Sequence, residues 1–176
     1  MPTLVVLRHA KADTPPGLQD IARPLAERGR ADAEAAGRWL AEHVGLPSLV
    51  VTSPARRTEE TTARVLDAWD AEPPVVDEER LYEATLGDLL RVVRGLDADP
   101  GDGPAPAPGA PGGLSGPDGT VVLVGHNPGL SDLVEALTGE VLQLRTCGIA
   151  VVDVAGPWAD ADTTSCSLRA TATPRA

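Results

Sequence analysis

The chain has few cysteines and no long apolar run, and each shortage excludes a class of protein. Cys147 and Cys166 are the only cysteines, too few for a disulfide framework and without the CxxC spacing of a metal site. We expect both thiols to be reduced. No apolar stretch approaches the roughly 20 residues that span a bilayer, and the N-terminus lacks the basic region and long apolar core of a signal peptide. These features predict a cytoplasmic protein that does not contact a membrane.

Positive charge is also scarce. The formal net charge is −11, whereas a duplex-binding protein needs a basic face to neutralise phosphates, so we expect no nucleic-acid partner. Arginine supplies fourteen of the fifteen basic residues, and the lone lysine is Lys11, two residues after His9. That position makes Lys11 a candidate substrate-binding residue, although chance would place it there about as readily.

Short apolar runs alternate with stretches that suit helices. The expected strands cover residues 4–7, 49–51, 75–76, 121–124, 149–154 and 167–171. The expected helices cover residues 31–43, 53–69, 86–96 and 129–137. This alternation predicts an α/β fold of three layers, α/β/α, with a largely parallel central sheet. The last two strands would close the sheet, as a hairpin at its edge.

One segment interrupts this alternation. Residues 97–119 hold six prolines and seven glycines among 23 residues, a composition typical of a flexible loop. Because strand and helix patterns resume directly after it, we interpret residues 97–119 as an insertion within a single domain of residues 1–176. A boundary between two domains is the weaker interpretation, because neither half would have a complete sheet.

Two of the three histidines follow buried strands. The apolar run of residues 4–7 leads into Arg8 and His9, and the run of residues 121–124 leads through Gly125 into His126. In an open α/β sheet, ligands bind outside the carboxyl ends of the strands. We therefore expect His9 and His126 to meet at a site there, rather than to be unrelated surface residues.

A third segment adds positive charge to the same edge of the sheet. Ser53-Pro54 predicts a helix start, with Ser at the cap and Pro in the first turn, and a helix N-terminus binds anions. Arg57 follows, and Arg8 precedes His9. A guanidinium can engage phosphate oxygens in pairs. The alternative for these arginines is surface ion pairing with Glu59 or Glu60, and we prefer that interpretation for Arg56.

Four blocks of sequence, in order, resemble the histidine phosphatase superfamily. They are Leu7-Arg8-His9-Ala10, Ser53-Pro54-Ala55-Arg56-Arg57-Thr58-Glu59-Glu60-Thr61, Leu81-Tyr82-Glu83 and Val124-Gly125-His126-Asn127-Pro128-Gly129-Leu130. The resemblance extends over most of the chain outside residues 97–119 and implies a phosphoglycerate mutase-like fold. The short length and the Arg-His-Ala-Lys start look most like bacterial phosphohistidine phosphatases of the SixA type. Ala10 stands where the broader superfamily has glycine.

The resemblance implies a role for each residue of these blocks. His9 would be the nucleophile and would be phosphorylated transiently, with Arg8, Arg57 and His126 around the phosphoryl oxygens. Glu83 would donate a proton to the leaving group. The alternatives are that Glu83 is merely a solvated acidic residue, or that Asp13 or Asp88 is the acid. Asn127 is a further candidate for substrate binding.

These residues predict a phosphatase that acts through a phosphohistidine intermediate. Its expected substrate is a phosphorylated protein carrying phosphohistidine; the alternative is a small-molecule phosphate ester, such as a sugar or nucleotide phosphate, used by a phosphatase or mutase. We expect no cofactor and no metal, because arginines beside two histidines would repel a metal ion. A binding module without activity would lack the nucleophile or the acid, and here both positions are filled.

Overall fold

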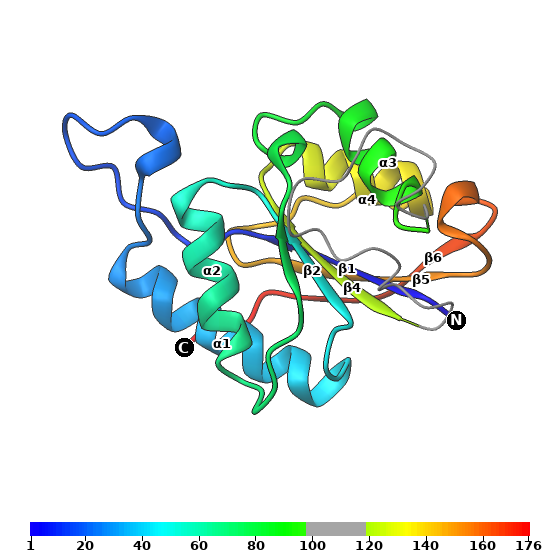
Figure 1. The fold of residues 1–176 in the computed structure, drawn as a ribbon, viewed down its shortest axis with the longest axis horizontal. Coiled ribbons are helices and arrows are strands. Elements are labelled where there is room, and N and C mark those ends of the chain that lie inside the picture. The colour runs from blue at the N-terminus through cyan, green and yellow to red at the C-terminus, as the bar shows by residue number, and fades with distance from the viewer. Residues whose placement is uncertain (98–118) are drawn as a thin grey trace.

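A computed structural model describes residues 1–97 and 119–176 as one mixed sheet packed between helices (Figure 1). The strands are β1 (Thr3–Arg8), β2 (Leu49–Thr52), β3 (Val75–Asp77), β4 (Thr120–Gly125), β5 (Ile149–Val154) and β6 (Cys166–Ala172). Their order in the sheet is β3-β2-β4-β1-β5-β6. The first four strands in that order are parallel, and β5 and β6 are an antiparallel pair at the edge next to β1. The predicted fold class and closing hairpin are confirmed.

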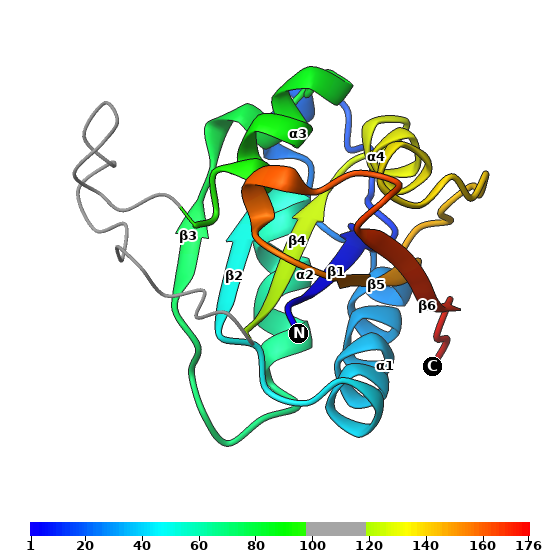
Figure 2. The same cartoon turned by 90° about the vertical axis from the view of Figure 1, so that its right-hand side faces the viewer.

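The helices cover both faces of this sheet (Figures 1 and 2). They are α1 (Glu27–His43), α2 (Arg56–Leu66), α3 (Leu86–Arg94) and α4 (Gly129–Thr138), with short 3₁₀ turns η1 (Asp20–Ala22), η2 (Glu79–Leu81) and η3 (Trp158–Asp160). None of the helices in the described ranges is long and apolar enough to cross a membrane.

Successive side chains of β1 point to opposite faces, as the pleat of a strand requires. Leu4 and Val6 belong to the core that includes α3 and α4. Val5 and Leu7 belong to the core that includes α1 and α2. Since both faces are covered, consecutive positions inside the central parallel strands are apolar, which explains the unbroken runs of Val and Leu in the sequence.

The predicted helix starts need correction. α1 begins four residues earlier than expected, at Glu27. Its first turn includes Gly29, which lies so close to the Lys11 backbone that a Cβ there would be 2.1 Å from the Lys11 carbonyl oxygen. α2 begins at Arg56 with Ala55 as its cap, so Ser53 is not the cap. The Ser53 hydroxyl instead contacts the backbone N–H of Ala55 and the ring of His126. The helix ends at Leu66 and Arg94 also fall short of the predicted 69 and 96.

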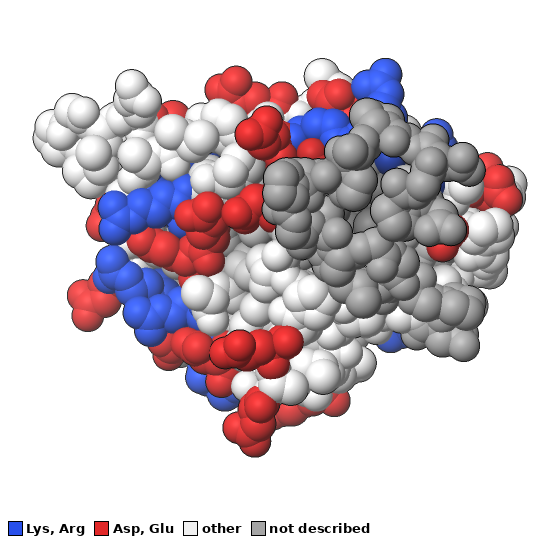
Figure 3. All heavy atoms as spheres, viewed as in Figure 1, with Lys and Arg blue, Asp and Glu red and all other residues white. Residues whose placement is uncertain are grey.

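Residues 98–118 lie outside the described residues, so the predicted insertion at 97–119 remains a prediction. On the described part of the face in Figure 3, arginine and lysine atoms are interspersed with acidic atoms and form no continuous basic strip. Such a strip is what duplex binding would require.

Candidate active site

The register of the sheet brings the two strand-end histidines together. Arg8 of β1 is paired with Gly125 of β4, and the next residues of these parallel strands are His9 and His126. The backbone N–H of His9 donates to the Gly125 carbonyl at 3.0 Å, and the two ring centroids are 5.2 Å apart. β2, on the other side of β4, ends at Thr52 and adds Ser53 to the same edge.

The hydrogen bonds of His9 determine which nitrogen carries its proton. Nδ1 lies 2.7 Å from the Ala10 carbonyl oxygen. A carbonyl can only accept, so Nδ1 carries the hydrogen and Nε2 keeps its lone pair. Burial lowers the pKa of His9 to about 4, and the guanidinium groups of Arg57 and Arg8 add to the shift. His9 is therefore a neutral imidazole near pH 7 with a free nucleophilic nitrogen.

His126 has the opposite tautomer. Nη2 of Arg57 lies 3.3 Å from its Nδ1, and a guanidinium can only donate, so Nδ1 accepts and Nε2 carries the hydrogen. Nε2 donates to the Ser53 hydroxyl at 2.8 Å. Burial lowers the pKa of His126 to about 3, with His9 and Arg57 as further causes. Both rings are thus uncharged, and the fixed positive charge of the site comes from arginines.

Arg8 and Arg57 each have a buried N–H group with no partner in the part of the chain that the structure describes. Nη1 of Arg8 donates to the Leu144 carbonyl at 2.9 Å, whereas Nε of Arg8 and Nε of Arg57 have no hydrogen-bond partner among the described residues. Buried donors in native proteins are nearly always paired, and exceptions call for an explanation. Two orphan guanidinium donors beside a neutral histidine suit an oxyanion.

Sequence comparison with known protein families and proteins identifies relatives of this chain. The family model of the histidine phosphatase superfamily (branch 1) matches residues 4–93. The uncharacterized Mycobacterium tuberculosis protein Rv1276c is 33% identical over 168 residues, which cover 89% of this chain and 92% of that protein. The chain belongs to the histidine phosphatase superfamily.

Two solved structures support the same assignment. A candidate phosphohistidine phosphatase SixA from Nakamurella multipartitia is 27% identical, with a TM-score of 0.78 over 99% of this chain and 97% of that one. A second SixA candidate, from Agrobacterium tumefaciens, is 27% identical, with a TM-score of 0.73 over 98% of this chain and 97% of that one. The protein is an enzyme of this family, a histidine phosphatase.

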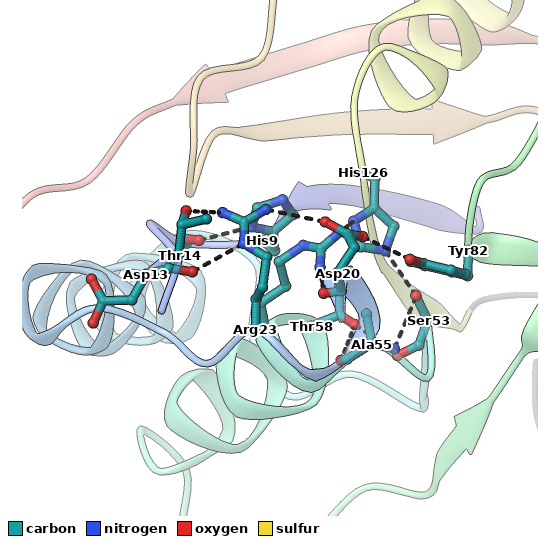
Figure 4. A network of polar contacts seen from close by, with 12 residues as sticks. His9, Asp13, Thr14, Asp20, Arg23, Ser53, Ala55, Thr58, Tyr82 and His126 are labelled. Atoms are coloured by element: carbon teal, nitrogen blue, oxygen red, sulfur yellow. Dashed lines mark hydrogen bonds and ion pairs between the residues drawn. The ribbon is translucent and has the colours of Figure 1, made fainter. Parts of the chain in front are cut away.

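The active site of this histidine phosphatase contains residues that the sequence analysis did not single out (Figure 4). Asp20, from η1, accepts hydrogen bonds from Arg57 at 3.1 Å, Arg23 at 3.2 Å and the Tyr82 hydroxyl at 2.6 Å. The Tyr82 hydrogen bond, followed by those of the two arginines, lowers the pKa of Asp20 to about 2. Tyr82 also packs edge-on against His126, with ring centroids 5.6 Å apart. No sequence pattern distinguishes Asp20 among the 26 acidic residues of the chain.

The three candidate acids have different surroundings. Asp88 completes a capping box with Thr85 at the start of α3 and pairs with Arg91 at 3.2 Å. Asp13 is exposed, and its carboxylate points away from His9 (Figure 4). Glu83 is exposed, directly follows Tyr82 and has a φ of 53°. Left-handed backbone is uncommon in residues other than glycine and is enriched at active sites, so Glu83 remains the proton donor that we predict.

The two other predicted substrate contacts, Asn127 and Lys11, have different surroundings. The amide nitrogen of Asn127 donates to the Leu144 carbonyl at 2.7 Å, the same carbonyl that Arg8 contacts. Its amide oxygen accepts hydrogen bonds from the backbone N–H and hydroxyl of Ser131. Lys11 has an exposed side chain, and its backbone carbonyl accepts from Ala26. Substrate contact by Asn127 or Lys11 therefore remains a prediction.

Arg56 forms the surface ion pair that we predict for it, with Nε 2.7 Å from a Glu60 carboxylate oxygen.

Within residues 1–97 and 119–176, no three His, Cys, Asp or Glu side chains form a group that could hold a metal ion.

The lowered histidine pKa values make the stability of the enzyme depend on pH. In the unfolded chain both imidazoles titrate near 6.5, but in the folded protein His9 titrates near 4 and His126 near 3. The unfolded state therefore binds more protons below pH 6.5, and the stabilisation present above that pH is lost as pH falls toward 4. Chemical denaturation at pH 7 and pH 5 measures the free energy of unfolding. Between these pH values it should fall more for the wild type than for the His9→Ala/His126→Ala variant. Equal losses would contradict the neutral histidines. Asp20 stays ionised in the folded protein at both pH values, so its titration does not contribute to the difference between wild type and variant.

Proposed function

We propose that this histidine phosphatase hydrolyses phosphohistidine on proteins through a phosphoenzyme at His9. The observation that carries the proposal is the state of His9: a neutral ring whose Nδ1–H is held by the Ala10 carbonyl and whose Nε2 is free. A nucleophile needs an available lone pair and a fixed direction, and this hydrogen bond supplies both.

The reaction has two steps. In the first, Nε2 of His9 attacks phosphorus in line, the bond from phosphorus to the leaving group breaks, and the leaving imidazole departs with a proton taken from solvent. In the second, water attacks the phosphorus held by His9, inorganic phosphate departs, and the neutral ring returns. Phosphoryl transfer requires mainly positioning and charge neutralisation. Arg8 and Arg57 would neutralise the phosphoryl oxygens, and His126 would lie beside them.

The leaving group favours phosphohistidine over an ester. An N–P bond is labile once its nitrogen is protonated, whereas the alkoxide of an ester needs a proton in the transition state. Glu83 is the candidate acid that directly follows Tyr82, whose ring packs against His126. The likeness to the two SixA candidates supports the same substrate class.

The alternative substrate is a small phosphate ester, whose leaving alkoxide needs a proton donor such as Glu83. The test is a panel with purified protein: a phosphohistidine-bearing protein, p-nitrophenyl phosphate, and sugar and nucleotide phosphates. We expect the highest kcat/KM for the phosphohistidine protein. A much higher value for a sugar or nucleotide phosphate would replace our proposal with the alternative.

Activity should not require a metal. The positive charge at the site comes from arginine side chains, and a metal ion beside them would be repelled. We expect exhaustive dialysis against EDTA to leave kcat/KM unchanged within error. Loss of activity that added zinc or magnesium restores would show that the two histidines and nearby carboxylates bind metal.

A further inference from the structure

Asp20 holds the end of the Arg57 guanidinium, and His126 contacts its side. The Arg57 side chain is 8% exposed, and a guanidinium is a rigid plane that acceptors can approach at its end, formed by Nη1 and Nη2, or at its side, formed by Nε and Nη2. Asp20 accepts from both donors of the end: its backbone carbonyl oxygen accepts from Nη1 at 2.8 Å and its carboxylate from Nη2 at 3.1 Å.

The side edge of Arg57 faces the histidines instead. Nη2 also donates to Nδ1 of His126 at 3.3 Å, and the buried Nε beside it has no partner among the described residues. An acceptor that completes this edge must therefore lie next to His126, whose ring is 5.2 Å from that of His9.

Asp20 is itself held by Tyr82, which follows η2, and by Arg23, which follows its own turn η1. The Tyr82 hydroxyl donates to the same carboxylate oxygen that Arg57 contacts, at 2.6 Å, and Arg23 donates to the other oxygen at 3.2 Å. The carboxylate is half-exposed, with 52% of its side chain open to solvent, so only these contacts fix its direction. Figure 4 shows Asp20 between Arg23 and Tyr82, next to His126.

We propose that Asp20 is a positioning residue that holds the end of Arg57 so that the unpaired Nε on the side of its guanidinium meets the phosphoryl group. The contact with the Asp20 carboxylate also holds Nη2 of Arg57 against Nδ1 of His126. This hydrogen bond fixes the tautomer of His126 in which Nε2 donates to Ser53. Asp20 makes no contact with the reacting atoms. This role rests on the proposed function, because it assumes that an oxyanion binds beside His9.

The two ways in which Asp20 can act on an anion have opposite signs. A carboxylate near the site repels an anion, so its removal would strengthen binding if charge alone mattered. If Asp20 positions Arg57, its removal weakens binding, because a misplaced donor costs affinity. The sign of the change therefore decides between them.

The experiment compares wild type, Asp20→Ala and Asp20→Asn, with Glu42→Gln as a control that removes one negative charge from an exposed position on α1. Tungstate, a tetrahedral dianion, is the probe, and its Kd is measured by calorimetry. We expect Asp20→Ala to raise the Kd by roughly 10- to 100-fold. Asp20→Asn keeps an oxygen acceptor and should recover most of that loss, and Glu42→Gln should match wild type.

Nitrogen-15 NMR of the histidine rings supplies a second measurement. In Asp20→Ala the backbone carbonyl still accepts from Nη1, but Nη2 loses the carboxylate, so the Nδ1 resonance of His126 should shift. A general loosening of the fold would also shift the His43 resonances. Tungstate binding to Asp20→Ala that is as tight as, or tighter than, binding to wild type would overturn the positioning role, and so would identical Kd values for the Ala and Asn variants. Wild-type protein that binds tungstate but hydrolyses no phosphate compound would contradict the proposed function and leave the Asp20 comparison valid. Absence of tungstate binding to wild type would overturn both.

Discussion

Replacing His9 with alanine should abolish turnover. Nε2 of His9 is the only free, neutral ring nitrogen in the described site, since both nitrogens of His126 are engaged. Loss of a nucleophile costs on the order of 10⁴-fold or more in kcat. Rapid quench with ³²P-labelled substrate should trap an acid-labile, base-stable phosphoenzyme in wild type and none in His9→Ala.

The matched control is His43→Ala. His43 is exposed on α1 and stacks on Trp39, with ring centroids 4.4 Å apart. It should retain wild-type kcat and phosphoenzyme. Circular dichroism of His9→Ala should match wild type, because the substitution removes a strand-end side chain and not a core residue. Wild-type turnover without any trapped phosphoenzyme, under conditions where it should accumulate, would contradict covalent catalysis.

The parts of the site that follow strands could be predicted from sequence. A parallel strand that is buried on both faces is visible in the sequence as a run of apolar residues. Catalytic and binding residues lie at the carboxyl end of such a strand. Arg8, His9 and His126 follow from this rule. Their proximity needs only that β1 and β4 be neighbours, and the register pairs Arg8 with Gly125.

Asp20 could not be predicted in the same way. It lies on η1, in the connection between β1 and α1, where no hydrophobic period fixes a direction for side chains. Its partners Arg57 and Tyr82 are 37 and 62 residues away in the chain. The role of Ser53 could not be predicted from sequence either, because Ser followed by Pro predicts a helix cap. Its hydroxyl serves His126 instead, a contact that depends on β2 and β4 being adjacent.

Glu83→Gln should separate two classes of substrate. Gln has nearly the same shape as Glu and keeps the same backbone strain, but it cannot donate the proton of a carboxylic acid. Hydrolysis of aryl or alkyl phosphate esters should slow by roughly 10²- to 10⁴-fold, the loss typical of a missing general acid. Dephosphorylation of the phosphohistidine protein should slow much less, because its leaving nitrogen can be protonated by solvent before the N–P bond breaks.

A series of aryl phosphates sharpens this test. Esters with a good leaving group need little proton transfer, so the ratio of wild-type to Glu83→Gln kcat/KM should grow as the pKa of the leaving phenol rises. Glu79→Gln, an exposed neighbour on η2, supplies the matched loss of charge and should leave the series unchanged. Equal losses on esters and phosphohistidine would refute the differential role. A ratio that is large but independent of the leaving group would mean that Glu83 binds substrate without donating a proton, because only proton donation in the transition state couples its effect to the basicity of the leaving oxygen.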